Sequence, residues 1–264
     1  MSIKSLMNYT FVSKYARWSE EDKRRETWNE AADRVEQMML DKYVLDDTEI
    51  KWAYDMMRKK RVLGSQRALQ FGGKPIVKHN ARIYNCIASF TDRLKFFQEC
   101  MYLLLCGCGT GFSVQKHHIS KLPPLLKEKN GQKKFVIPDT IEGWSDAVGV
   151  LVSSYFKQSR LFPEYNGKNV IFDYSEIRPA GAFLKSSGGK APGPEPLKKA
   201  LTSIKKVLDK VIKSGVNKIK PIDAYDIVMF SADAVISGGV RRSATICVFS
   251  ADDEEMAKAK TGNW

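Results

Sequence analysis

The sequence predicts an α/β protein in which parallel strands and connecting helices follow a helical amino-terminal region. Two observations lead to this prediction. Residues 15–62 are polar and carry apolar side chains at helical spacing, whereas from about residue 62 short apolar runs of strand composition alternate with amphipathic helices. No repeat, low-complexity stretch or linker divides residues 62–264. We therefore expect a helical region over 1–61 and a single α/β domain over 62–264.

The amino-terminal helical region is predicted from one long charged segment. Ser19 is a candidate N-cap, and charged turns follow it. The apolar residues that recur at helical spacing are Trp28, Ala31, Val35, Met38 and Met39. Such a stripe on a charged helix is typical of one face packed against a core.

Four amphipathic helices are predicted in the α/β part. Thr91 is a candidate cap for the first, and an Asp139-x-x-Glu142 box after Pro138 begins the second. The third lies within 195–212, and the fourth, within 223–239, ends at two glycines. The residues expected to face the core are Leu94, Phe97, Met101, Leu104 and Leu105; Trp144, Val148, Leu151, Val152 and Tyr155; Leu197, Leu201, Ile204, Leu208 and Val211; and Ala224, Ile227, Val228, Ser231 and Val235.

Four strands are predicted over 80–90, 111–114, 169–174 and 244–250. The first contains Asn85 and Cys86 side by side, where valine would pack better. A cysteine at such a position is either a small buried residue or a thiol with a chemical role.

Composition narrows the class of protein. The chain of 264 residues is 43% hydrophobic and 11% aromatic, enough for a real core. No apolar run approaches the roughly 20 residues of a membrane span, and the start MSIKSLMNYTF lacks the apolar stretch of a signal peptide. We therefore expect a cytoplasmic protein without a membrane partner. The five cysteines are odd in number and irregularly spaced, so they do not predict a disulfide framework.

The net charge of +13 favours an anionic partner such as nucleic acid, a membrane surface or a phosphorylated small molecule. Solvated helix faces explain much of it, because the lysines are spread along the chain. No helix-turn-helix, zinc-finger or RNA-binding motif occurs, so sequence-specific nucleic-acid binding is not expected.

Three loops have unusual composition: CGCGTGFSV (106–114), the Gly/Pro/Ser-rich 178–197, and 237–245 with Arg241 and Arg242. Glycine-rich turns supply free N–H groups and adjacent arginines supply forked donors, which together suit polyphosphate. Each loop alone is as well explained as a structural turn, but three in one domain favour an anionic ligand. A metal site is not expected, since Cys106-x-Cys108 is too tight for the usual hook and two histidines are adjacent at 117 and 118.

Several segments, in order along the chain, resemble the amino-terminal half of a ribonucleotide reductase catalytic subunit, closest to the adenosylcobalamin-dependent (class II) branch. They are RIYNCIASF, GCGTGFSVQKHHISKLP, IPDTIEGW, FDYSEIRPAGAFLKSSGGKAPGPEPL and SGGVRRSATICVFSADDEEMAKAKTGNW. The most specific pieces are RPAGA, GPEPL and GGVRRSA, and the resemblance runs from about residue 8 to the last residue. It implies a ten-stranded α/β barrel made of two parallel halves, of which this chain supplies the first.

The resemblance also implies the chemistry: radical reduction of ribonucleotides to 2′-deoxyribonucleotides by a redox cysteine pair. Cys86 is implied as one of the pair. A thiol with an ordinary pKa of about 8.5 is mostly protonated at neutral pH and can give a proton to the departing 2′-hydroxyl. Asn85, Ser65 and Gly109 would lie against the substrate, although Gly64 stands where the family commonly has proline.

For the deoxynucleotide (dNTP) effector, the resemblance implies that Asp92 and Arg93 hold the sugar. His118 and Arg178 fall at phosphate-binding positions, where a histidine at 118 departs from the family pattern. The loops 185–193 and 237–244, the latter with Arg241 and Arg242, would link effector identity to substrate choice.

The radical-forming cysteine, the catalytic asparagine and glutamate, and the partner of Cys86 have no counterpart in this sequence. We therefore expect the chain to be inactive alone and to need a carboxy-terminal half, adenosylcobalamin, and an external dithiol reductant such as thioredoxin. No ATP-binding cone is present, so control of overall activity by ATP and dATP is not expected. The alternative is a non-catalytic nucleotide-binding or assembly fragment; Cys86 beside Asn85 favours the first interpretation.

Overall fold

The computed structural model describes residues 2–43, 47–184, 189–236 and 243–261. The chain forms two compact units, one of residues 1–85 with 185–188, and one of residues 86–184 with 189–264. None of the helices in the described ranges is both long and apolar enough to cross a membrane.

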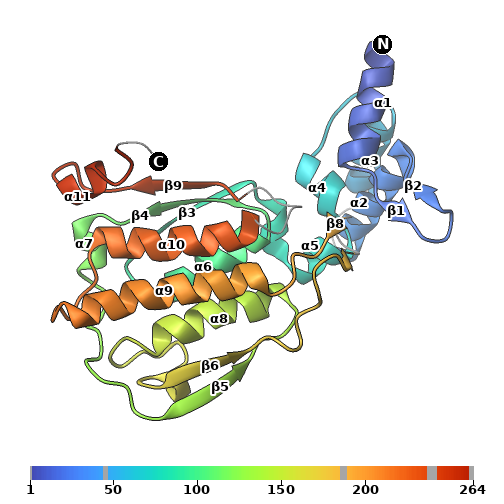
Figure 1. Cartoon of the computed structure of the whole chain (residues 1–264). Coiled ribbons are helices and arrows are strands. Elements are labelled where there is room, and N and C mark those ends of the chain that lie inside the picture. Colours follow the sequence, from blue (N-terminus) through green and yellow to red (C-terminus); the bar gives the residue numbers. More distant parts are fainter. Residues whose placement is uncertain (1, 44–46, 185–188, 237–242, 262–264) are drawn as a thin grey trace. The chain divides into compact units, whose positions relative to one another are not determined.

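The amino-terminal unit is helical, with one small hairpin (Figure 1). Its elements are α1 (Ile3–Lys14), β1 (Trp18–Ser19), β2 (Arg24–Arg25), α2 (Trp28–Lys42), α3 (Asp47–Arg58), α4 (Gln66–Phe71), α5 (Lys74–Lys78) and the 3₁₀ helix η1 (Asn80–Ile83). Two small cores hold it together; their buried members are Val35, Met38, Ala68, Phe71 and Ile76, and Ala31, Met57 and Leu69. The predicted stripe is therefore confirmed at 31, 35 and 38, while Trp28 and Met39 are only partly buried.

The predicted cap at Ser19 is wrong. Ser19 lies in the β1–β2 hairpin, where its Oγ accepts a hydrogen bond from the Asp22 N–H at 3.1 Å. The helix begins at Trp28, and Thr27 caps it through a reciprocal box with Glu30. Thr27 Oγ1 accepts from the Glu30 N–H while the Glu30 carboxylate accepts from the Thr27 N–H, so two otherwise unpaired donors are satisfied.

The second unit is mixed α/β with parallel sheets, as the sequence predicted. Its strands are β3 (Cys86–Phe90), β4 (Gly109–Ser113), β5 (Gln132–Val136), β6 (Asn169–Asp173), β7 (Phe183–Leu184), β8 (Gly189–Lys190) and β9 (Thr245–Val248). Its helices are α6 (Lys95–Leu105), α7 (Lys116–Ile119), α8 (Ile141–Ser153), the 3₁₀ helix η2 (Pro163–Tyr165), α9 (Glu195–Lys213), α10 (Pro221–Ile236) and α11 (Glu254–Ala257).

Two separate parallel sheets lie on either side of the long helices (Figure 1). One is three-stranded in the order β3-β4-β9, and the other pairs β5 with β6. Helices α6, α8, α9 and α10 pack on one another between them. Every core residue predicted on these helices is buried except Leu105, which is partly buried. The described strands thus give an open parallel arrangement, and closure into a barrel remains a proposal.

Several boundaries differ from the predictions. Residues 80–83 form η1, so the strand over 80–90 shortens to β3. The side chain of Thr91 is fully buried and does not cap α6, which follows Leu94 without a side-chain cap. For α8 the cap is Thr140, whose Oγ1 accepts from the Gly143 N–H at 2.9 Å, because Asp139 is engaged in an ion pair. The end of α10 at two glycines lies outside the described residues.

Candidate thiol and nucleotide site

One face of the three-stranded sheet is open. Parallel pairing sets Cys86 opposite Gly109, and the alternating side chains of β3 place Cys86, Ala88 and Phe90 on the exposed side. On β9 the exposed side chains are Ile246 and Val248, 70% and 51% accessible. The opposite face is packed, since Phe112 contacts an aromatic ring on α6 and another on α10. The open face therefore consists of apolar side chains, two glycines of β4 and one thiol.

The thiol of Cys86 is set apart from the other cysteines. All five cysteines lie in the described residues and are free, and Cys86 alone is exposed. Burial raises the pKa of Cys100 to about 12 and that of Cys247 to about 11, so both remain protonated at neutral pH. Cys247 also belongs to the partly buried residues of β9, not to its exposed ones. Of the five thiols, Cys86 is the most accessible to a small molecule.

The other three predicted substrate residues have different surroundings. Gly109 is the direct neighbour of Cys86 across the strand pair. Asn85 is exposed and immediately precedes Cys86 in the chain. Ser65 caps α4, with its Oγ accepting from the Ala68 N–H at 3.3 Å. Ser65 belongs to the amino-terminal unit, whereas Cys86 belongs to the second unit.

A charged cluster lies at the carboxyl end of β3, where Asp92 and Arg93 follow the strand. The Arg93 guanidinium binds Asp92 at 3.1 Å and Glu99 at 2.6 Å, and it also donates to Ser89 Oγ at 3.3 Å. Lys121 adds a second cation, with its Nζ 3.8 Å from the Asp92 carboxylate. Asp92 thus lies between two cations, and one carboxylate oxygen contacts each.

His118 joins this cluster through the end of β4. Its Nδ1 lies 2.9 Å from Ser113 Oγ, and its ring centroid lies 4.6 Å from Phe90 and 3.9 Å from His117. Burial lowers the pKa of His118, and the neighbouring charges of His117 and Lys121 act in the same direction. The ring is therefore neutral at pH 7, and it can stack or hydrogen-bond but adds no cation for a phosphate.

The other arginines predicted to bind the effector are Arg178, Arg241 and Arg242. Arg178 forms an ion pair with Asp139, so the ends of β5 and β6 are joined and Arg178 is separate from the Asp92 cluster. Arg241 and Arg242 lie outside the described residues, as does part of each predicted specificity loop. The structure thus brings Asp92, Arg93 and His118 together, and it pairs Cys86 with Gly109 at the other end of the same strands.

Sequence reasoning missed three contributors to the cluster: Glu99, Ser113 and Lys121. The basic stretch that begins at Lys116 and contains both adjacent histidines was a usable signal, because it follows a predicted strand end. The contacts of Glu99 could not be read from spacing, since its partner Arg93 lies before the helix that carries it.

Comparisons with known proteins agree on one family. Residues 117–208 match the model of the insertion domain of B12-dependent ribonucleotide reductases. Curated relatives named adenosylcobalamin-dependent ribonucleoside-triphosphate reductase, from Lactobacillus gasseri and Lactobacillus delbrueckii subsp. bulgaricus, are 26% and 28% identical over 95% of this chain and 42% of their own length. A putative enzyme of the same name from Mycobacterium phage D29 is 27% identical over 86% of this chain and 37% of its own.

A solved structure shares the fold of this chain. A crystal structure of a B12-dependent (class II) ribonucleotide reductase superposes with a TM-score of 0.77 over 96% of this chain and 42% of that one, at 24% identity. The chain is thus similar to the amino-terminal half of class II ribonucleotide reductases, as its motifs indicated. It spans about two fifths of the length of these relatives, 42% in the longest matches.

Proposed function

We propose that this chain is the amino-terminal half of an adenosylcobalamin-dependent ribonucleotide reductase, reducing ribonucleoside triphosphates as the names of its relatives state. The observation that carries the proposal is the exposed thiol of Cys86 on the open sheet face, directly opposite Gly109. A glycine there leaves room for a substrate to lie over the strand pair within reach of the sulfur. In this arrangement Asn85 and Ser65 contact the nucleotide, and the helical region 1–61 precedes the catalytic domain.

Cys86 acts as one of two reducing thiols, and its partner is a cysteine of the carboxy-terminal half. During the reaction the 2′ carbon–oxygen bond breaks, the hydroxyl takes a thiol proton and leaves as water, and hydrogen takes its place. The two thiols lose two electrons and form one disulfide, so atoms and electrons balance. An external dithiol such as thioredoxin then reduces that disulfide by exchange.

Adenosylcobalamin supplies the radical when it is bound. A corrin carries amide groups around its rim and needs hydrogen-bonding partners, whereas the open face around Cys86 presents Ala88, Phe90, Ile246 and Val248. These side chains do not fit the corrin rim, so we assign no residue of this chain to the cofactor and derive no step through it. In the proposal the carboxy-terminal half holds it.

The same apolar face supports a carboxy-terminal partner. Phe90, Ile246 and Val248 are each more than half exposed, and within the described sheet β3 and β9 are edge strands. Exposed apolar side chains beside unpaired strand edges favour association. We propose that the carboxy-terminal half covers this face and completes the barrel.

The Asp92 cluster is the proposed effector site. Asp92 gives up its contact with one of its two cations and accepts a hydrogen bond from the deoxyribose hydroxyl. Glu99 and Ser89 hold the Arg93 guanidinium beside Asp92, where it can contact the same sugar. A neutral His118 packs against the nucleotide instead of neutralising phosphate. Phosphate charge is then met by Arg241 and Arg242, and Arg178 joins them only if it leaves its ion pair with Asp139.

Complementation tests this proposal. The chain alone should form no deoxynucleotides with adenosylcobalamin and a dithiol, and addition of a complementary carboxy-terminal reductase half should produce turnover. Effector binding without turnover in the reassembled protein would instead support a non-catalytic nucleotide-binding fragment.

A further inference from the structure

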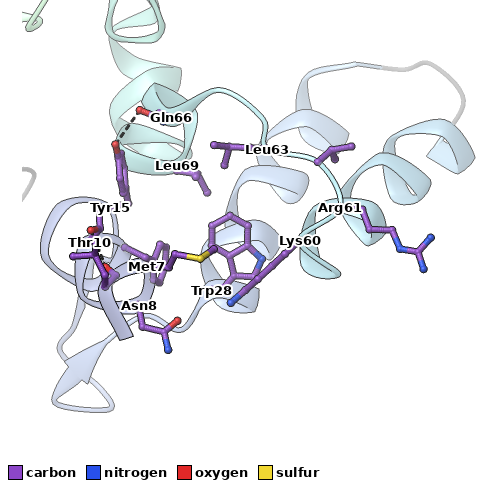
Figure 2. A pocket seen from close by; sticks show the side chains of 13 residues that line it. Met7, Asn8, Thr10, Tyr15, Trp28, Lys60, Arg61, Leu63, Gln66 and Leu69 are labelled. Atoms are coloured by element: carbon purple, nitrogen blue, oxygen red, sulfur yellow. Dashed lines mark hydrogen bonds between the residues drawn. The ribbon is translucent and has the colours of Figure 1, made fainter. Parts of the chain in front are cut away.

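The amino-terminal unit contains a groove that the reductase proposal does not use. Helix α1, the first residue of α2 and the segment from Lys60 to Gln66 enclose a cavity of about 580 Å³ (Figure 2). Its walls include Met7, Phe11 and Trp28. This volume falls within the roughly 300–1,000 Å³ typical of small-molecule sites.

The walls of the groove are held in place before any ligand binds. Trp28 Nε1 donates to the Met57 carbonyl at 2.9 Å, and the Phe11 ring meets the Trp28 ring edge-on at 5.4 Å. Tyr15 donates its hydroxyl hydrogen to Gln66 Oε1 at 2.9 Å, which ties α1 to the start of α4. The indole face is therefore a fixed apolar platform.

The rim of the groove is apolar and unpartnered among the described residues. Leu6 and Met7 on α1 are each 55% exposed, and Leu63 on the facing segment is 59% exposed. The sulfur of Met7 points toward Trp28 (Figure 2). An apolar ligand body that fills the groove would cover these side chains.

The ionic side chains that line the groove are positively charged. Among its lining residues in the described part of the chain none is a carboxylate, and the two ionic ones are Lys60 and Arg61. In the same basic run Arg58 pairs with Asp33 and Glu36, and Lys59 pairs with Asp55 at 2.6 Å. Within the described part of the chain, Lys60 and Arg61 have no ion pair. Of the four cations at 58–61, the two that have no carboxylate partner are thus the two that line the groove.

Lys60 is held where its backbone would favour glycine. Lys60 follows the end of α3 and has a φ of 57°. The Lys60 and Arg61 N–H groups donate to the Met57 and Met56 carbonyls at 3.0 Å, which ends the helix. Its ammonium lies 5.8 Å from the centroid of the Trp28 ring. Figure 2 shows the Lys60 side chain extended along Trp28, whereas Arg61 lies farther out.

We propose that this groove binds an organic anion with an apolar body, of the acyl-carboxylate class. The acyl chain lies along Trp28, Phe11 and Met7, and the carboxylate meets the Lys60 ammonium at the edge of the indole. Arg61 adds attraction from the outer rim. The site does not depend on the reductase proposal, because all its residues lie in the amino-terminal unit.

Titration of dodecanoate below its micellar concentration into the full chain tests the proposal, with calorimetry and tryptophan fluorescence as readouts. We expect saturable binding to one site and no saturable binding of dodecylammonium. Lys60→Gly should weaken dodecanoate binding about 5-fold or more, as loss of one partly desolvated charge contact does. Because glycine suits the positive φ, the melting temperature of this variant should not fall. Lys59→Ala, next to the groove but not lining it, is the matched control and should bind normally.

Equal binding of both amphiphiles, or unchanged affinity in Lys60→Gly, would overturn the proposal. Absence of amphiphile binding, together with a dimer in sedimentation that Met7→Glu dissociates, would also overturn it and assign the groove to a second copy of the chain.

Discussion

Cys86 and Gly109 lie directly opposite each other in the parallel pairing of β3 and β4, on the face of the sheet that carries the exposed side chains of β3. One residue contributes an exposed thiol and the other contributes no side chain. The pair therefore combines a reactive group with the space beside it.

Gly109→Val should lower kcat/KM for the ribonucleotide in a reassembled enzyme by roughly 10-fold or more, since a side chain would occupy space beside Cys86. Steady-state kinetics measures this effect. Gly111→Ala is the matched control on the same strand face, because its added Cβ would meet Ile246 at 3.3 Å and Ala88 at 3.7 Å instead of Cys86. Equal losses in the two variants would show that the effect is only one of packing.

Asp92→Asn should weaken dNTP binding by roughly 5- to 150-fold, which corresponds to about 1–3 kcal/mol for a lost buried hydrogen bond. Calorimetric titration of the reassembled enzyme measures it. Asp252→Asn, which breaks the ion pair with Lys116 instead, should leave dNTP affinity unchanged. Normal dNTP affinity in Asp92→Asn would remove Asp92 from the effector site.

His118 should make stability depend on pH in a defined direction. Burial lowers its folded pKa below the unfolded value of about 6.5, so the unfolded chain binds more protons in this range. The contribution of His118 is present above about pH 6.5 and is lost as the pH falls through the folded pKa. Urea unfolding at pH 7.5 and 5.5 should show a smaller loss of stability in His118→Gln than in the wild type.

The neighbouring histidine gives a graded comparison for this measurement. The His117 ring lies 3.9 Å from that of His118 and its charge also lowers the pKa of His118, so His117→Gln should lose less of the pH dependence than His118→Gln does. The same pH dependence in wild type and His118→Gln would contradict the assignment of the effect to His118.

Thr27→Ala should lower the free energy of unfolding by about 1 kcal/mol, because it removes one side of the capping box on α2. Ser19→Ala, at the position first predicted as the cap, should cost clearly less, since Ser19 only supports an exposed hairpin turn. Chemical denaturation of both variants decides between the two positions, and a larger loss at Ser19 would contradict the capping assignment.

The long helices of the second unit could be predicted with their buried faces, because burial against a shared core imposes periodicity on the sequence. Leu197, Leu201, Ile204 and Leu208 of α9 are fully buried at the spacing the sequence showed. By contrast, β5 was not predicted: its sequence QKKFV has two lysines and alternates exposed with partly buried residues. Its pairing with β6 is decided by tertiary contacts that leave no local signal.

The candidate site could also be predicted only in part from the sequence. Cys86 could be found because a thiol stands in a predicted strand where valine would pack better, and Asp92 could be found from the resemblance to reductases. The register that sets Cys86 against Gly109 could not, since strand pairing depends on residues far apart in the chain. The low pKa of His118 also required the structure, because it follows from burial and from Lys121.

The most direct test of Cys86 as a reducing thiol is multiple turnover in the enzyme reassembled with a carboxy-terminal half, adenosylcobalamin and a dithiol reductant. Cys86→Ser should abolish multiple turnover, while Cys247→Ser, a half-buried thiol among the packed residues of β9, should keep it. Mass spectrometry of the enzyme after one turnover without reductant should find Cys86 in a disulfide with a cysteine of the other half. Normal multiple turnover in Cys86→Ser, or a free Cys86 after turnover, would contradict this role.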